Sequence, residues 1–408
     1  MRKRLFNRDE RGISTVIVAV SLLGLFGAAM LSLDAGNMWQ TRRNIITVTD
    51  ATALGQAKYL AFASNQGACE PTWTDFMLNL DGAGAAVTPL NCTPTAAGNG
   101  TGYVVVDGRK EARTRFGGLF GIGNTEPYSL SAAQWGYISE ARGLRPISFC
   151  NKNSHAKEWL GYKNGAGSWG PAVTETQYLA LAAAGDDNGD GKIDHPSYPA
   201  IANSYSNPPV VHRMYFNNDL DDGQCGNFPG SWGWLNFDGG SAANPDRNDW
   251  TENGYNDGTV TIREDGEPAC PASPGNGEAD DAEAGCVPAD SGAISNANSD
   301  ALDAILGQKV HIMLFDEGNC VNTAGGGVTC NFESWAIMGV VLRGYDATGP
   351  EADRYLDFEF TDIMLSGTCC VSAPVNGVDT GSRGVKICEV DHDFQAGSTI
   401  ASRCVPTA

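Results

Sequence analysis

Apolar residues are concentrated in one long stretch near the start of the chain. Residues 13–33 contain no charged side chain, and eleven of these 21 residues are Leu, Ile, Val or Phe. As a helix with a rise of about 1.5 Å per residue, the stretch would be roughly 31 Å long, which matches the hydrocarbon thickness of a bilayer. Backbone groups in lipid must be satisfied within their own segment, so the pattern predicts a transmembrane helix over residues 13–33.

The charges that flank this stretch predict its orientation. Residues 1–12 hold five basic side chains, whereas the next basic residues, Arg42 and Arg43, come only after Asp34. The positive-inside rule therefore assigns residues 1–12 to the cytoplasm as a basic leader, with the bulk of the chain exported. The alternative is a signal peptide cut near Ala29, although the apolar run is longer than the usual 7–15 residues and no A-x-A site is present.

The helical pattern continues beyond the apolar stretch. Residues 34–62 contain no proline, and Ile46, Ala53, Ala57 and Leu60 recur at steps of three, four and seven residues. Such spacing places them on one face of a helix. We therefore expect an exported helix extension over residues 34–62, continuous with the membrane segment as in pilin-like helices.

Shorter patterns follow and predict a small α+β domain over residues 63–148. Residues 63–100, rich in Ala, Gly, Thr and Asn, are expected to form a loop. A strand is predicted at Gly102–Asp107, a helix at Arg109–Phe120 and a second strand at Ser129–Ser139. The anchor helix would pack on the sheet that these strands form.

Residues 149–408 predict a mostly β domain. Strand-like runs occur at Val210–Phe216, Thr259–Ile262, Val310–Phe315, Ala336–Leu342 and Leu356–Phe360. In the last run Asp357 and Glu359 alternate with apolar residues, which predicts one polar and one apolar face. Asp300–Gly307 predicts a short helix that ends at a glycine. The fold class expected for the whole chain is α+β.

The cysteines indicate an oxidising compartment. There are twelve, an even number, all after the membrane stretch and none in a C-x-x-C pair, which favours disulfides over a zinc site. Sequence alone does not fix the pairing. We expect the short loops Cys69–Cys92, Cys270–Cys286 and Cys320–Cys330, pairing among Cys369, Cys370, Cys388 and Cys404, and Cys150–Cys225 as the remainder.

The net charge of the chain limits the classes of molecule that it is expected to bind. The net charge is −21, and residues 1–33 carry +3, so the remainder carries −24. A surface of this sign repels nucleic acid and anionic headgroups, so no nucleic-acid role is expected. It is compatible with divalent cations and with simple solvation.

One acidic segment has the spacing of a calcium loop. Oxygen ligands fall at positions one, three, five and nine, and a backbone carbonyl at seven: Asp186, Asn188, Asp190, Asp194 and the carbonyl of Lys192. Position twelve is Ser197 in place of the bidentate glutamate. The segment is therefore either a structural calcium site or an ion-free acidic turn, and no other cofactor is expected.

Motifs for catalysis are weak. Ala-Gly-Ser-Trp-Gly at residues 166–170 loosely resembles a nucleophile elbow, but Pro171 follows at once and no strand-like run leads into it. The five histidines are scattered without an H-E-x-x-H motif, and no Walker A loop is present. We expect a protein that is not an enzyme.

The N-terminal residues resemble TadE/TadG-like proteins of the Flp (tight adherence) pilus system. The matching pieces are R-G at Arg11-Gly12, L-D-A-G at residues 33–36, two arginines at 42–43, and D-A-T-A-L at residues 50–54. Residues 103–107, 111–122 and 128–137 are similar to the strand, helix and strand that follow in that family. The resemblance is faint beyond residue 148.

Two departures from that family's pattern define the subclass. Prepilins and TadE-type pseudopilins carry a glutamate five residues after the cleavage glycine, but counting from Gly12 that position is Ile17. The chain therefore resembles TadG and should keep its leader. No D-x-S-x-S motif is found, so the von Willebrand A domain of many TadG proteins is expected to be absent.

The resemblance implies a function. It is that of a non-catalytic accessory or assembly component of a Flp-type pilus or secretion apparatus, anchored by a single pass in the bacterial inner membrane with its bulk in the periplasm or at the cell exterior. Its partners would be other single-pass pilus-assembly proteins, contacted through the membrane helix. The alternative is a calcium-dependent surface-binding or adhesion protein that uses a TadG-like anchor. The ligand of the distal domain stays open.

Overall fold

The computed structural model describes residues 10–80, 87–98, 100–121, 123–164, 211–215, 225–226, 232–237, 244–271, 285–290, 295–322, 328–350, 354–366 and 369–388. The chain forms two compact units. The first comprises Met1–Ala97, Gly102–Gln134 and Ile387–Val405, and the second comprises Gly98–Thr101, Trp135–Lys386 and Pro406–Ala408.

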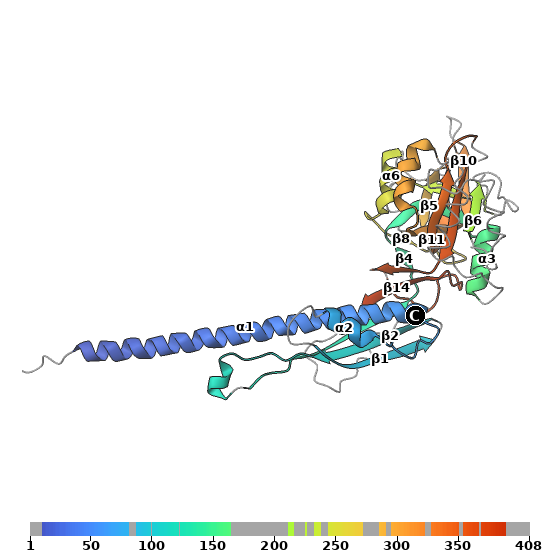
Figure 1. Cartoon of the computed structure of the whole chain (residues 1–408). Coiled ribbons are helices and arrows are strands. Elements are labelled where there is room, and N and C mark those ends of the chain that lie inside the picture. The colour runs from blue at the N-terminus through green and yellow to red at the C-terminus, as the bar shows by residue number, and fades with distance from the viewer. Residues whose placement is uncertain are drawn as a thin grey trace, which may run out of the picture. The chain divides into compact units, whose positions relative to one another are not determined.

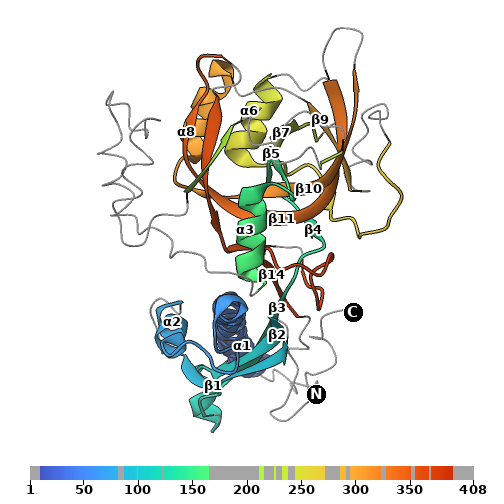
Figure 2. The same cartoon turned by 90° about the vertical axis from the view of Figure 1, so that its right-hand side faces the viewer.

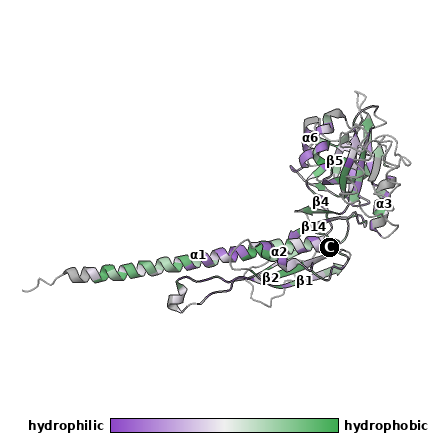
Figure 3. Cartoon of the chain, viewed as in Figure 1, coloured by the Kyte–Doolittle hydropathy of each residue, from purple (hydrophilic) through white to green (hydrophobic). Residues whose placement is uncertain are grey.

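The first unit is built around α1, one unbroken helix from Glu10 to Phe62 (Figure 1). Its 53 residues confirm the prediction that the membrane stretch and its extension form a single helix. No residue from Thr15 to Leu33 is buried, and the most apolar part of the helix has a mean hydropathy of 2.4. By length and composition, α1 can span a membrane. Figure 3 shows its apolar residues gathered in the half that projects from the rest of the unit.

The second half of α1 carries a buried stripe. Ala53, Ala57 and Leu60 are fully buried, as the periodicity predicted. Ile46 is partly exposed, and Ile45 is the buried residue instead. Ile45 lies three residues before Val48 and four before Thr49, which are both buried, so it belongs to the same stripe.

A second helix and three strands pack with α1. They are α2 (Trp73–Leu80), β1 (Thr88–Gly98), β2 (Thr101–Arg109) and β3 (Tyr128–Gly136), with β2 between β1 and β3. In Figure 2, α1 is seen nearly end-on with α2 beside it and the strands beneath. The loop expected over residues 63–100 therefore contains a helix and a strand. The Phe76 ring of α2 packs at Gly55, where a Cβ atom would lie 3.0 Å from it.

The helix expected at Arg109–Phe120 does not form. Residues 110–127, here called the arm, leave β2 and return to β3 as an extended hairpin, in which the Ala112 amide donates to the Thr125 carbonyl (2.7 Å) and the Thr125 amide to that of Ala112 (3.1 Å). Among the described residues of the arm, one helical turn forms, η1 (Gly117–Phe120). Glycines at 117, 118 and 121 oppose a longer helix, because each costs about 1 kcal/mol relative to alanine.

The second unit contains a seven-stranded sheet in the order β10-β5-β7-β9-β11-β12-β6. Its strands are β5 (Leu144–Cys150), β6 (Val211–Tyr215), β7 (Trp232–Leu235), β9 (Cys286–Asp290), β10 (Lys309–Asn322), β11 (Val328–Asp346) and β12 (Tyr355–Thr361). Because β10 also pairs with β11, five of these strands close into a ring from which β12 and β6 extend.

Smaller elements complete the second unit. They are β4 (Glu140–Ala141), β8 (Val260–Thr261), β13 (Ile363–Ser366), β14 (Ser382–Ile387), α3 (Ser154–Lys163), α6 (Asn244–Asn253), η2 (Asn296–Asn298) and α8 (Ser299–Ile305). The five predicted strand runs are all observed, and β10 and β11 extend well beyond the runs that predicted them. The short helix α8 ends as expected, since Gly307 follows it with a φ of 74°.

Aromatic pairs fill the core on both faces of the large sheet. Phe149 contacts Phe358 edge-on at 4.9 Å between ring centres, and Phe315 stacks on Phe332 at 4.0 Å. The predicted polar face of β12 is not exposed, because Asp357 and Glu359 are nearly fully buried. The strand is covered on both sides, which its alternating pattern could not reveal.

The disulfides follow the expected pairing. Bonds join Cys69 to Cys92, Cys150 to Cys225, Cys270 to Cys286, and Cys320 to Cys330. Cys369 bonds to Cys370, within the group of four that was expected to pair internally, and Cys388 is also disulfide-bonded. Cys404 lies outside the described residues.

A buried ion pair provides a test of the second unit. The Arg343 side chain donates to Glu359 from Nε (2.8 Å) and Nη2 (2.5 Å), and both side chains are largely buried. We predict that Glu359→Gln lowers the free energy of unfolding by about 3 kcal/mol, because it removes a negative charge that lies against a largely buried guanidinium. Denaturant unfolding followed by tryptophan fluorescence measures this.

The exposed pair between Arg109 and Glu126 (3.0 Å) is the matched control. Glu126→Gln should cost less than about 1 kcal/mol, since exposed pairs contribute little. Equal losses in the two variants would contradict the importance of the buried pair.

Candidate functional site: the junction between helix and arm

The first charged residue after the apolar run of α1 is the centre of a built site. Asp34 follows Leu33 directly, and its carboxylate lies against the backbone of the arm. Three consecutive amides donate to it: Arg115 to Oδ1 (2.8 Å), Phe116 to Oδ2 (3.0 Å) and Gly117 to Oδ2 (2.7 Å). The carboxylate thus binds the turn that leads into η1, as an anion binds a helix N-terminus.

A second side chain of α1 strengthens this junction. Asn37 lies one turn further along the same face, and its amide donates to the Arg113 carbonyl (2.8 Å). Residues spaced by three positions are neighbours on a helix surface, so Asp34 and Asn37 hold adjacent parts of the arm. We call Asp34, Asn37 and residues 113–117 the junction.

Electrostatics favour an ionised Asp34. Desolvation by the arm raises the pKa of this carboxyl, but the hydrogen bonds from the amides of Arg115, Gly117 and Phe116 outweigh it. The nearby Arg115 charge acts in the same direction as those bonds. The net result is a pKa below 3.8, so Asp34 is negatively charged at neutral pH.

A cavity of about 200 Å³ lies between α1 and the arm. Its α1 side is apolar at Leu31, Ala35 and Met38, and its arm side includes Gly117 and Thr125. The junction therefore holds the arm to α1 by polar contacts beside an apolar hollow. What the junction can do chemically is position a segment; its one carboxylate is already occupied by three donors.

Comparison with known proteins gives no match: no protein-family model, curated protein or solved structure matches this chain. Function is therefore inferred from the residues and the geometry.

The structure does not describe the predicted calcium ligands. Asp186, Asn188, Asp190, Lys192 and Asp194 lie outside the described residues. Within the described part of the chain, no group of three or more His, Cys, Asp or Glu side chains could hold a metal ion. The calcium site stays a prediction.

The second unit holds another charged cluster. Asp379 accepts two hydrogen bonds from Arg383, at 2.7 and 2.6 Å, and the Arg383 guanidinium lies 4.0 Å from the centre of the Tyr137 ring. Burial alone would raise the pKa of Asp379, but the hydrogen bonds from Arg383 lower it below its usual value. The Asp379 carboxylate and the Arg383 guanidinium compensate each other's charge, which is typical of an ion pair that stabilises the fold.

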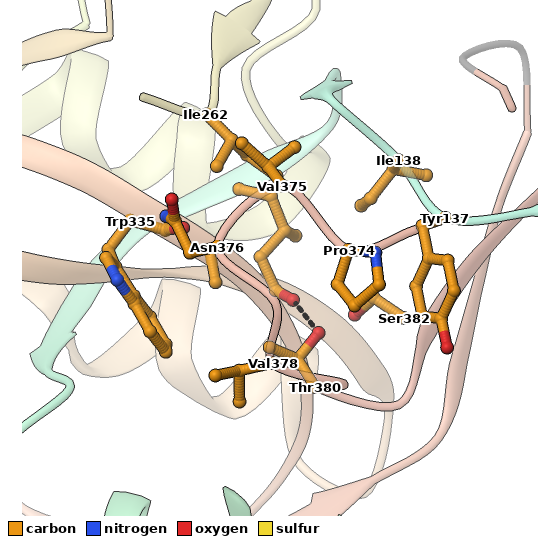
Figure 4. Close-up of a pocket in the computed structure, with 12 residues that line it drawn as sticks. Tyr137, Ile138, Ile262, Trp335, Pro374, Val375, Asn376, Val378, Thr380 and Ser382 are labelled. Atoms are coloured by element: carbon orange, nitrogen blue, oxygen red, sulfur yellow. Dashed lines mark hydrogen bonds between the residues drawn. The ribbon is translucent and has the colours of Figure 1, made fainter. Parts of the chain in front are cut away.

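The pocket beside this cluster is small. Figure 4 shows Tyr137, Pro374, Asn376 and Thr380 among its lining residues, with the Thr380 hydroxyl donating to the Ile337 carbonyl (2.7 Å). Its volume is about 20 Å³, room for a single water molecule. This pocket does not accommodate an organic substrate.

The sequence did not predict the contact between Asp34 and the arm. Asp34 belongs to the L-D-A-G segment on which the family resemblance rests, yet nothing local indicated that its partner would lie some eighty residues away. The one available signal was position: a carboxylate directly after a transmembrane run needs hydrogen-bond donors or water. The glycines of the arm favoured an irregular turn, but the prediction of a helix in this segment did not take them into account.

We predict that Asp34→Ala releases the arm. The amides of residues 115–117 lose their shared acceptor, so hydrogen exchange in a peptide covering residues 113–121 should accelerate by about tenfold or more. Asn37→Ala should have a smaller effect, because it removes one hydrogen bond. Gln40→Ala, an exposed position on α1, is the control; unchanged exchange in Asp34→Ala would contradict the junction.

The junction should also depend on acid. Because the pKa of Asp34 is lowered in the folded state, its contribution is present above about pH 3.8 and is lost as the pH falls through the lower folded value. We predict that the NMR shifts of the amide protons of Arg115, Phe116 and Gly117 titrate together with a midpoint below 3.8. A midpoint above 3.8, or the same titration in Asp34→Ala, would contradict this assignment.

Proposed function

We propose that this protein is a membrane-anchored, non-catalytic accessory or assembly component of a Flp-type pilus or secretion apparatus. The observation that carries the proposal is α1: one helix whose first half is apolar and unburied, while its second half forms the core of a folded unit. Such a helix couples a bilayer rigidly to an exported domain. The proposal places residues 1–12 in the cytoplasm and the folded units in the periplasm or at the cell exterior.

Contacts between α1 and the sheet support the resemblance to TadG-like N-termini. The Ser131 hydroxyl on β3 lies 2.6 Å from the Asp50 carboxylate and 2.7 Å from the Thr49 hydroxyl. Asp50 begins the D-A-T-A-L segment, and the buried Thr52 and Ala53 belong to it. The segment that carries the resemblance is thus the one that joins helix to sheet, in keeping with an α+β domain of that class.

The membrane half of α1 also offers a surface for partners. A Cβ atom added at Gly24 or Gly27 would meet no atom within 4 Å, so both positions face away from the rest of the chain. With Ala28 and Ala29 they form a small-residue segment of the kind that permits close helix approach in membranes. The proposed partners are other single-pass proteins of the same apparatus.

We predict that the mature protein keeps its leader and its anchor. The membrane fraction should retain the chain after carbonate extraction, and intact-mass analysis should find residues 1–12 present. A variant in which a cleavable signal peptide replaces residues 1–33 should be soluble and should fail to restore pilus assembly in cells that lack the wild-type chain. A native chain that begins near residue 30, or restoration by the soluble variant, would reject the proposal.

A second candidate function is calcium-dependent surface binding. The spacing of Asp186, Asn188, Asp190 and Asp194 favours it. The same anchor would then display an adhesive distal unit in place of an assembly component.

This alternative predicts a calcium-dependent stability. For a site of roughly millimolar affinity, calcium at ten times Kd should add about 1.4 kcal/mol to the free energy of unfolding. The double variant Asp186→Asn, Asp190→Asn should abolish the shift in thermal melting, whereas Asp221→Asn, Asp222→Asn should preserve it. No shift in the wild-type chain at 10 mM calcium would exclude the calcium-dependent function.

A further inference from the structure

The cavity between α1 and the arm is large enough to hold part of an apolar ligand. Its volume is about 200 Å³. For comparison, an engineered apolar cavity of about 150 Å³ binds benzene. On the α1 side, Leu31 and Met38 line the cavity and keep 55% and 46% of their surface exposed. The described part of the arm therefore leaves two large apolar side chains of α1 uncovered beside a hollow.

The cavity spans the end of the apolar stretch of α1. Leu31 belongs to that stretch, and Met38 lies seven residues further along, or about 10 Å along the helix axis. Figure 1 shows the arm extending back beside α1 toward its projecting half. If residues 13–33 fill the hydrocarbon layer, one end of the cavity is level with the acyl chains and the other with the headgroups.

The charged groups at the cavity favour an anionic ligand. Arg113 lines the cavity and is exposed, and no carboxylate in the described part of the chain forms an ion pair with it. Asp34 is the one acidic residue among the described lining residues, and three backbone amides donate to it. The nearby Arg115 compensates its charge further. Arg113 is therefore the charged group that a ligand would meet, on a chain whose exported part is strongly acidic.

We propose that this cavity binds one acyl chain of an anionic phospholipid, with the headgroup phosphate at Arg113. The apolar side chains of Leu31 and Met38 cover the acyl chain on the α1 side, and the guanidinium pairs with the phosphate. The lipid then fills the space between α1 and the arm, which the polar contacts of the junction leave open. The lipid site rests on the membrane anchoring of α1 in the proposed function.

A phospholipid matches the cavity better than a side chain of a partner helix does. A phospholipid carries an apolar chain and an anionic phosphate in one molecule, as the apolar wall and Arg113 require side by side. An apolar side chain from a partner would fill the hollow, but it would leave Arg113 without a counter-charge unless a second, acidic residue also reached it.

Native mass spectrometry of the full chain in detergent tests the headgroup contact. The chain is titrated with phosphatidylglycerol or with phosphatidylcholine. We expect the first phosphatidylglycerol to bind about fivefold more tightly, because one arginine meets its net charge. Arg113→Gln should remove this preference, and it keeps the backbone carbonyl that accepts the Asn37 hydrogen bond. Arg142→Gln, at an exposed position of the second unit, is the charge-matched control and should preserve it.

Filling the cavity tests the acyl chain. Ala35 lines the cavity, so the ring in Ala35→Phe should take the place of the chain and weaken the first binding of both lipids by about tenfold or more. Ala19→Phe adds the same volume at an exposed position of the membrane stretch, outside the cavity, and should bind as the wild type does. Hydrogen exchange over residues 113–121 checks that the arm stays in place.

The results distinguish the lipid site from the anchor. Equal affinity of the wild-type chain for the two lipids, or a preference that Arg113→Gln retains, would overturn the lipid site and leave the anchor intact. Unchanged binding in an Ala35→Phe chain with a held arm would do the same. If that variant releases the arm, Arg113→Gln alone decides. Loss of the wild-type chain from membranes on carbonate extraction would instead reject the anchor.

Discussion

The first unit depends on one constraint: a single helix must suit two different solvents. From Thr15 to Leu33 the surface of α1 is apolar all round, which suits lipid and would be costly in water. From Ile45 to Leu60 it buries a stripe of one helix face against the sheet and exposes the other. Because α1 is unbroken from Glu10 to Phe62, these two halves form one continuous element.

Asp34 is the first charged residue after the apolar half of α1. A carboxylate next to a hydrocarbon layer is costly unless its charge is compensated, and three backbone amides of the arm supply that compensation. The compensation works in both directions, since the same carboxylate satisfies amides that a glycine-rich turn would otherwise leave to water. Asp34 therefore gives the arm a defined position beside α1.

Sequence predicted those features whose cause is local. The apolar run and the absence of proline up to Phe62 predicted α1, and the short separations between cysteines favoured the pairs that the structure shows, although they did not fix them. What it missed depends on distant partners: α2 is stabilised by packing on α1, the arm is held by Asp34, and Glu359 is buried because Arg343 lies opposite it. The error at Ile46 is of a different kind, since a single apolar position cannot by itself fix the rotation of a helix. None of the calcium ligands can be compared, because residues 165–210 are not described.

The family resemblance therefore reports on packing more than on binding chemistry. Asp34 binds the arm, and Asp50, Thr52 and Ala53 lie where α1 meets the sheet, so the similar residues define a way of attaching a sheet to a membrane helix. Such a mode of attachment places no requirement on the fold of the second unit. The second unit contains a closed ring of strands and buried ion pairs. The sequence of α1 does not determine this fold.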